Sequence, residues 1–143
     1  MKSLITIACF LIVPFLSNAQ TVTGKWKTID DDSGKEKSIV ELYEQNGMVY
    51  GKVIKLFREP GEEQDPVCKE CDDDRKDQKV IGMVIIRDMK PGNGYYSGGT
   101  ICDPKNGKVY KCEFWLSEGD PGKLELRGYW GWIYRTQYWF RTE

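Results

Sequence analysis

Hydrophobic residues in this chain recur at every second position in short runs, and turn-forming residues separate these runs. A period of two is typical of strands that bury one face, and after residue 20 no long stretch has helical spacing. We predict strands near residues 21–29, 38–45, 48–57, 79–88, 94–102, 108–117, 123–130 and 134–141. This pattern indicates an all-β protein, an up-and-down antiparallel barrel of about eight strands, with a sandwich as the alternative.

Two turns predict how neighbouring strands are aligned. Asn46-Gly47 is a strong signal for a two-residue hairpin, because both residues tolerate positive φ. The pairs predicted across it are Tyr43 with Tyr50, Glu41 with Lys52, and Val40 with Val53. Across the turn region 117–122, the predicted pairs are Leu116 with Leu124, Phe114 with Leu126, and Glu113 with Arg127. Both alignments put aromatic, apolar or oppositely charged residues opposite each other, which supports them.

The first residues have the pattern of an export signal. Lys2 precedes an apolar run that ends at Leu16, and Ser17-Asn18-Ala19 supplies the small residues of a cleavage site. We therefore expect residues 1–19 to be a signal peptide and residues 20–143 to form a single β-barrel domain, either periplasmic or secreted. The apolar run is too short to span a membrane, which takes about 20 residues, and we expect no transmembrane segment elsewhere.

Composition excludes several classes of function. The chain has 21 Lys plus Arg and 22 Asp plus Glu, a balance that argues against nucleic acid as a partner. It contains no histidine, which excludes Ser-His-Asp and Cys-His catalysis and any zinc site that needs imidazole. Phosphate-binding and dinucleotide-binding glycine motifs are also absent from the sequence. We expect no cofactor and no enzymatic activity.

Cysteines and acidic residues gather in the long connection near residues 58–78. Cys68 and Cys71 form a Cys-x-x-Cys motif, and we interpret the pair as a structural disulfide of an oxidising compartment. Free or mixed pairing, and metal or redox use, remain alternatives. Cys102 and Cys112 lie on the two strands of one predicted hairpin, too far apart along it to share a metal or a disulfide. The surrounding acids lack the spacing of an EF-hand, so we expect a solvated, mobile loop and no metal.

Aromatic residues crowd the C-terminal part of the chain. We select four rings as candidate ligand contacts, with nearby polar side chains as anchors, although an aromatic core is the simpler reading of each single ring. The candidates are Tyr129, Trp130, Trp132 and Tyr138.

Several short motifs together carry a family resemblance. Gly24-Lys25-Trp26 resembles the Gly-x-Trp that opens lipocalins. In that superfamily the Trp closes the base of the barrel and an Arg of the last strand packs on it, which implies Trp26 with Arg141, or alternatively Arg135. The further motifs are Cys68-x-x-Cys71, Gly82-Met83-Val84-Ile85, Gly98-Gly99-Thr100-Ile101-Cys102-Asp103-Pro104, Gly107-Lys108-Val109-Tyr110, Leu126-Arg127-Gly128-Tyr129 and Thr136-Gln137-Tyr138-Trp139. This set resembles an exported bacterial family classified as domain of unknown function 2147, with a lipocalin-like barrel. The resemblance implies fold and compartment but no functional residues.

Three functional hypotheses follow. The first is an exported, non-enzymatic domain that binds a small apolar or amphipathic ligand inside the barrel. The second is an envelope protein–protein interaction module that docks through an exposed sheet edge or the 58–78 loop. The third is a hydrolase that uses carboxylates. A roomy interior would favour the first, an exposed apolar patch the second, and a cleft with two close carboxylates the third.

Overall fold

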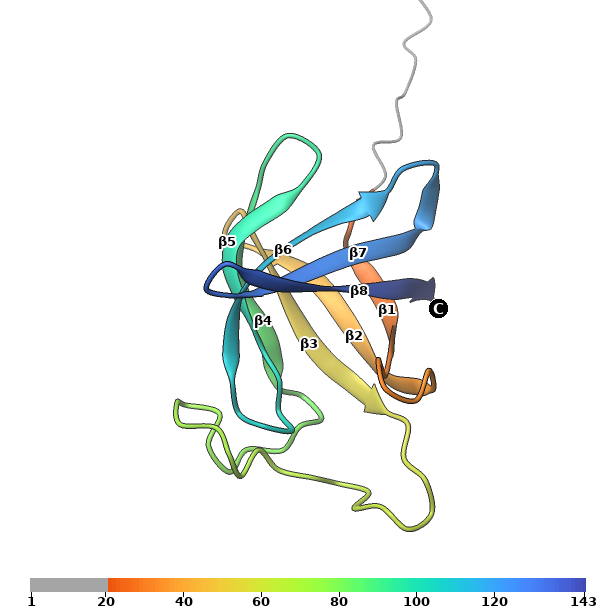
Figure 1. Cartoon of the computed structure of the whole chain (residues 1–143), viewed down its shortest axis with the longest axis vertical. Helices are drawn as coiled ribbons and strands as arrows, with labels where there is room; N and C mark the ends of the chain where they lie inside the picture. The colour runs from red at the N-terminus through yellow and green to blue at the C-terminus, as the bar shows by residue number, and fades with distance from the viewer. Residues whose placement is uncertain (1–20) are drawn as a thin grey trace, which may run out of the picture.

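A computed structural model describes residues 21–143, and these residues form eight strands (Figure 1). The strands are β1 Gly24–Ile29, β2 Glu36–Gln45, β3 Met48–Leu56, β4 Val84–Pro91, β5 Tyr96–Cys102, β6 Val109–Ser117, β7 Asp120–Trp130 and β8 Ile133–Thr142. Burial alternates along most of them. In β1, for example, Trp26 and Thr28 are buried, and they alternate with the more exposed Lys25 and Lys27. The alternation of the sequence is therefore the alternation between the inner and outer faces of one sheet.

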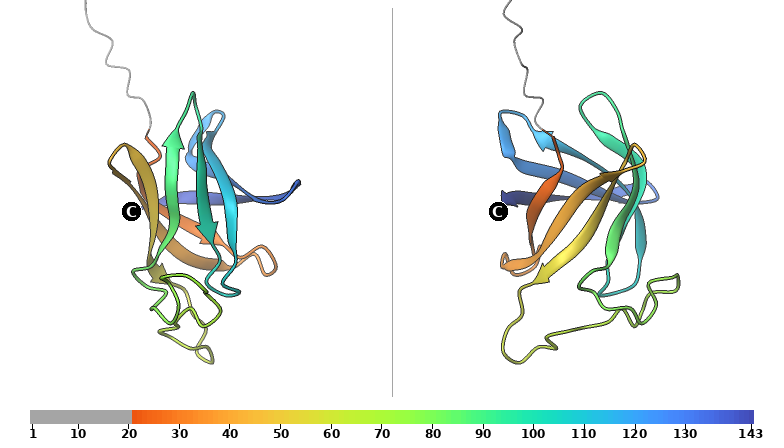
Figure 2. Two further views of the ribbon diagram at one scale, coloured as in Figure 1. Left: turned by 90° about the vertical axis from the view of Figure 1, so that its left-hand side faces the viewer. Right: turned by 180° about the vertical axis from the view of Figure 1, so that it is seen from behind.

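Every strand pairs antiparallel with the next along the chain, and β8 returns to pair with β1. The result is a closed up-and-down barrel, which confirms the predicted fold class over the sandwich (Figure 2). The seam is short, because only Lys25–Lys27 of β1 pair with Phe140–Thr142 of β8, and residues 133–139 of β8 have no partner strand on that side among the described residues. Residues 1–19, expected to be a signal peptide, lie outside the described part of the chain.

Both predicted registers are confirmed. The Asn46-Gly47 turn has positive φ at each residue and pairs Tyr43 with Tyr50, whose rings stack 5.9 Å apart. The same hairpin pairs Glu41 with Lys52 and Val40 with Val53. Strands β6 and β7 pair Leu116 with Leu124, Phe114 with Leu126, and Glu113 with Arg127.

Strand β4 begins later than we predicted from the sequence. We predicted it near residues 79–88, whereas β4 spans Val84–Pro91. Residue 79 instead forms an isolated bridge with Val67, and Gly82 turns the chain with a φ of 90° before β4 starts. The apolar residues at 80 and 83 are buried by loop packing, which a pattern of alternation cannot distinguish from strand pairing.

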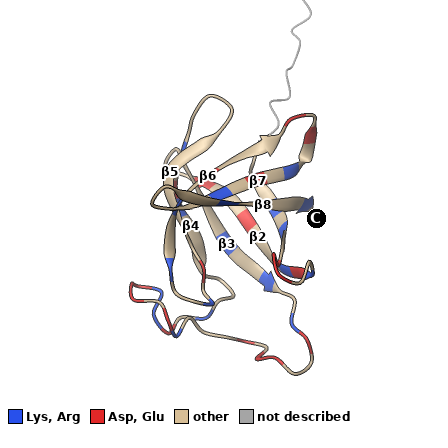
Figure 3. Cartoon of the chain, in the orientation of Figure 1, with Lys and Arg blue, Asp and Glu red and all other residues tan. Residues whose placement is uncertain are grey.

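The connection of residues 57–83 is not solvated throughout, because part of it packs against the barrel. Cys68, Cys71 and Arg75 are buried within it, and Val80 and Met83 belong to the hydrophobic core. The expectation that this whole stretch is a mobile, solvated loop is therefore wrong for its second half. Most charged residues of the loop are exposed, and Figure 3 shows both signs of charge along it.

Strand order divides the connecting loops between the two ends of the barrel, although Figure 1 shows the β7–β8 turn projecting at the side, away from the long 57–83 connection. Short turns at residues 46–47, 92–95 and 118–119 lie at the end where β1 begins and β8 ends. Residues 30–35, 57–83, 103–108 and 131–132 connect the strands at the opposite end, which we call the mouth. No helix in the described residues is long and apolar enough to cross a membrane.

Candidate functional site

Trp26 fills the barrel at the end opposite the mouth. Its side chain is 0% exposed, and its indole Nε1 donates a hydrogen bond to the Val22 carbonyl at 2.8 Å. The guanidinium carbon of Arg141 lies 4.3 Å from the centre of the Trp26 ring. Arg141 also donates hydrogen bonds to the carbonyls of Thr23 at 2.9 Å and Thr21 at 2.7 Å. A planar cation can stack on the indole while its N–H groups hold the backbone, which the ammonium of Lys cannot do as well.

Gly24 makes room for this arrangement. A Cβ at residue 24 would lie 2.9 Å from Nη1 of Arg141, and the backbone there has a φ of 125°, which L side chains rarely adopt. The Gly-x-Trp sequence thus has a structural explanation, with glycine for the approach of the arginine and tryptophan for the interior.

A cavity of about 1120 Å³ occupies the other end of the barrel and opens at the mouth. This volume is slightly above the range of about 300–1,000 Å³ for small-molecule sites, because it includes the open mouth and its charged rim. Apolar side chains from six strands and the long loop form much of its wall. They include Val53, Leu56, Val80, Ile85, Ile101, Tyr110, Leu126 and Trp139. Such a wall can bury an apolar group without leaving polar atoms unpaired.

Two polar groups interrupt the apolar wall. The hydroxyls of Thr28 and Ser38 lie 2.7 Å apart across β1 and β2, and both side chains are buried. Because each hydroxyl carries one proton and one proton serves their mutual bond, the pair retains one O–H donor. Farther round, Trp139 Nε1 donates to the Gln137 amide oxygen at 3.3 Å, and the Gln137 amide donates to Asp31 at 2.7 Å.

Charged residues of both signs surround the mouth. Lys35 and Glu59 join the 30–35 and 57–83 connections by a 2.9 Å ion pair. The hydrogen bond from Lys35 lowers the pKa of the Glu59 carboxyl below its usual range, and the same contact raises the pKa of Lys35. Arg135 approaches Asp31 at 3.7 Å on the β8 side. The site therefore combines an apolar interior with a polar, charged entrance.

The four aromatic candidates do not gather at this cavity. Trp130 lines it and has the Lys108 ammonium 4.6 Å from its ring centre. Trp132 is 90% exposed in the β7–β8 turn, and Tyr138 lies on the outer face beneath Lys123. The Tyr129 hydroxyl bonds to the Glu113 carboxylate on the outer face. Alternation along β7 and β8 explains the division, since Tyr129 and Tyr138 occupy outward positions.

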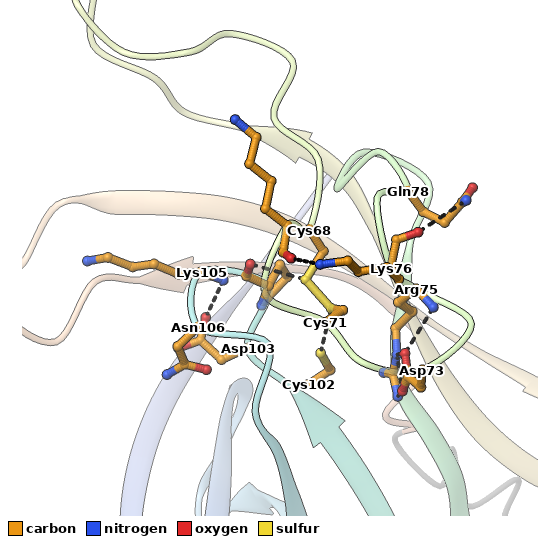
Figure 4. The surroundings of a disulfide bond; sticks show 12 residues. Cys68, Cys71, Asp73, Arg75, Lys76, Gln78, Cys102, Asp103, Lys105 and Asn106 are labelled. Atoms are coloured by element: carbon orange, nitrogen blue, oxygen red, sulfur yellow. Dashed lines mark hydrogen bonds and ion pairs between the residues drawn. A yellow bond between two sulfur atoms is a disulfide. The ribbon is translucent and has the colours of Figure 1, made fainter.

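Three sulfur atoms meet where the long loop touches the end of β5 (Figure 4). Cys68 and Cys71 form the predicted disulfide. Cys102 and Cys112 are buried free thiols, as expected from their separation on the β5–β6 hairpin, where Cys102 pairs with Val109 and not with Cys112. Burial raises the pKa of the Cys112 thiol to about 12. The sulfur of Cys102 lies only 3.8 Å from that of Cys71.

Two of the three aspartates at 72–74 form ion pairs with arginines. Asp73 accepts hydrogen bonds from the buried Arg75, the shortest at 2.7 Å, and this contact lowers the Asp73 pKa to about 2. Asp74 forms a two-fold ion pair with Arg87 of β4, with both distances 2.8 Å. Within residues 21–143 no group of three or more cysteine or carboxylate side chains is arranged to hold a metal ion. Asp74 thus ties the loop to β4, whereas Asp73 holds Arg75 within the loop.

Sequence reasoning missed two parts of this region. The approach of Cys102 to Cys71 joins residues 31 positions apart, and no local pattern signals it. Only one member of the Thr28–Ser38 pair could be predicted, because alternation with Trp26 places Thr28 inside the barrel. Ser38 follows from the pairing of β1 with β2, which no short turn fixes.

A closed eight-stranded meander with an apolar cavity and a Trp–Arg stack at its far end has the architecture of the lipocalin-like barrels. One solved structure supports this class directly: "Protein HP1028 from the human pathogen Helicobacter pylori belongs to the lipocalin family". It superposes with a TM-score of 0.71 at 23% sequence identity, covering 86% of this chain and 84% of the other. This likeness shows the fold.

The family follows from a sequence comparison. Residues 24–141 match the family described as "Uncharacterized protein conserved in bacteria (DUF2147)", and the chain belongs to it. The match covers all eight strands almost completely. A search of curated proteins found no match.

Proposed function

We propose that this protein is an exported, non-enzymatic carrier or receptor that binds one small apolar or amphipathic molecule in its barrel. The supporting observation is the cavity of about 1120 Å³, with apolar walls and a charged mouth. An apolar tail would contact Leu126 and Trp139, and a polar head would face the mouth. In this proposal the Thr28–Ser38 hydroxyls orient the ligand, and the Trp26–Arg141 stack closes the opposite end, so that ligand enters only by the mouth.

Export and domain boundaries form part of the proposal. We propose that residues 1–19 are removed as a signal peptide and that residues 20–143 form one domain. The Cys68–Cys71 disulfide supports an oxidising compartment, where such bonds persist. N-terminal sequencing of protein recovered from cells tests the cleavage, with Gln20 as the expected first residue.

Filling the cavity tests ligand binding. Gly128 lines the cavity, and a Cβ placed there would meet nothing closer than 3.9 Å, so the backbone accepts a side chain and Gly128→Phe should direct a ring into the cavity. Gly61→Phe is the matched control, because residue 61 faces open space. Two probes would be titrated, a fatty acid carrying an environment-sensitive fluorophore and an uncharged naphthalene dye. We expect saturable binding of at least one probe, weakened more than about tenfold by Gly128→Phe and unchanged by Gly61→Phe.

The result can contradict the proposal in two ways. Absence of saturable binding of either probe would remove its support. Equal affinity in the two glycine variants would place the probe outside the barrel. Native mass spectrometry of protein purified from its own envelope complements the titration, because it reports the mass of any molecule that the cavity retains.

A docking module is the second candidate, favoured by the exposed β7–β8 turn. Trp130, Trp132 and Ile133 are 69%, 90% and 60% exposed there, although large apolar side chains are usually covered. The barrel is closed, but β8 pairs with β1 only through Phe140–Thr142, so residues 133–139 beside this turn also present an edge with no partner strand in the described part of the chain. A photo-crosslinking residue at 132 should capture one defined partner in the envelope. The same residue at position 95, where Tyr95 is exposed at the other end, should not.

The carboxylate hydrolase gains no support from the described residues. A general acid needs a raised carboxyl pKa, whereas every shifted carboxyl pKa in this part of the chain is lowered. The causes are hydrogen bonds from Lys35, Arg75, Arg87 and the Ser33 backbone.

A further inference from the structure

The disulfide of the long loop has a free thiol in contact with it. Cys71 forms the disulfide with Cys68, and the Cys102 sulfur lies 3.8 Å from the Cys71 sulfur (Figure 4). All three side chains are at most 2% exposed, so the contact is enclosed by protein. Thiol–disulfide exchange proceeds by attack of one sulfur on a disulfide sulfur, and two sulfurs in contact satisfy its first requirement.

We propose that Cys102 is an alternative partner of Cys71 and that the loop disulfide can exchange within the molecule. The Cys102 thiol loses its proton to solvent, and its sulfur attacks the Cys71 sulfur. A Cys71–Cys102 bond forms, the Cys68–Cys71 bond breaks, and the Cys68 sulfur leaves with the electron pair and takes up a proton. One disulfide and one thiol are present before and after, so no oxidant or reductant is consumed.

The leaving sulfur already has a hydrogen-bond acceptor. The Cys68 sulfur lies 3.3 Å from the Pro104 carbonyl oxygen. As part of a disulfide this sulfur has no proton to donate. After exchange, the Cys68 thiol could donate its proton to Pro104 at the distance that the structure already provides. The surroundings therefore accommodate the product as well as the starting pair.

Exchange would change how the loop is attached to the barrel. The Cys68–Cys71 bond joins residues three apart within one loop, whereas a Cys71–Cys102 bond would join the loop to the end of β5 across 31 residues. Cys102 and loop residues Val67 and Glu70 all line the cavity. The Cys68–Cys71 pairing is thus a bond within the loop, whereas the Cys71–Cys102 pairing would tie the loop covalently to β5 at one wall of the mouth.

Burial, together with the charges around Cys102, determines when exchange is fast. Burial is the main cause that raises the pKa of this thiol, and Asp73 and Asp103 raise it further, whereas Arg75 and Arg87 oppose the rise. The thiol is therefore protonated at neutral pH, and the attacking thiolate is scarce. Below the thiol pKa, each added pH unit should increase the exchange rate about tenfold.

The decisive experiment maps the disulfides of purified wild-type protein. Samples are held without oxygen between about pH 7 and about pH 10, quenched in acid, alkylated and digested. We expect a peptide pair linked through Cys71 and Cys102, together with alkylated Cys68, which accumulates faster as the pH rises. Detection of Cys68–Cys71 alone at every pH would overturn the proposal, and this measurement needs no variant.

A variant tests the same contact from the other side. In Cys68→Ser, treatment with a thiol oxidant should link Cys71 to Cys102 in most molecules. Cys112→Ser is the matched control, because it removes the other buried thiol and should leave the wild-type exchange unchanged. If oxidised, folded Cys68→Ser keeps Cys71 and Cys102 alkylatable, the two sulfurs do not react and the proposal fails.

Discussion

At one end of the barrel a buried tryptophan fills the interior, whereas the other end holds an open cavity of about 1120 Å³. The filled end has short turns at 46–47, 92–95 and 118–119, and the mouth carries the long 57–83 connection. Side chains at the filled end are held by packing and by the hydrogen bonds of Arg141. Those at the mouth are held largely by ion pairs and one disulfide. In the proposed function, the filled end supplies stability and the open end is left for the ligand.

Removal of the buried indole should give the largest effect. Trp26→Ala leaves a void in the filled end and should lower the free energy of unfolding by about 3–5 kcal/mol. Trp132→Ala at the mouth is the matched control and should change it by less than about 0.5 kcal/mol, because that ring is already 90% exposed. Urea denaturation of the two variants measures both values. Similar losses in the two variants would end the distinction between the ends.

Acid should weaken the mouth selectively. The folded pKa of Asp73 is about 2, below its usual 3.8, so its contribution is complete above about pH 4 and is lost as the pH falls towards 2. Its side chain is one-third exposed, so we expect Asp73→Asn to cost about 1–2 kcal/mol at neutral pH. The difference from wild type should shrink towards zero near about pH 2.

Asp32→Asn supplies the control for this titration, because residue 32 is exposed in the 30–35 connection. Urea denaturation at several pH values would compare both variants with wild type. A cost of Asp73→Asn that does not change with pH would show that the Arg75 contact acts through shape and not through charge.

The smallest effect concerns the arginine at the filled end. Arg141→Lys keeps the positive charge but loses the planar stack on Trp26 and the paired hydrogen bonds to the backbone. We expect it to lower the free energy of unfolding by about 1 kcal/mol. Arg135→Lys, 74% exposed at the mouth, should leave the unfolding free energy unchanged. Thermal unfolding followed by circular dichroism would resolve the pair. Equal midpoints for both variants would mean that the stack adds nothing to the packing of Trp26.

Features set by neighbouring residues could be predicted from the sequence. Asn46-Gly47 determines its own turn, and that turn determines the pairing of Tyr43 with Tyr50. The inward position of Trp26 follows from alternation over a few residues. The Cys68–Cys71 bond joins residues only three apart, so the two sulfurs are close by sequence alone. Whether they form a disulfide then depends mainly on whether the compartment is oxidising.

Features set by distant residues could not be predicted in this way. Alternation alone places Tyr129 and Tyr138 outside, but the fates of Trp130, which lines the cavity, and Trp132, which is 90% exposed, depend on how the end of the hairpin lies against the rest of the barrel. The start of β4 depends on the packing of the preceding loop against the barrel. The Cys71–Cys102 contact has the same origin, because the loop must fold back before the two sulfurs meet.

The pairing of β1 with β8 has a consequence for the order of events during folding. Trp26 pairs with Arg141, so residues near opposite ends of the described chain must find each other before the barrel closes. Contacts of such long range slow folding, because most of the chain loses its freedom before they form. A chain made from its N-terminus holds β1 unpaired on one side until the last strand is complete. Loss of only the final three or four residues should therefore trap an open sheet that is prone to aggregation.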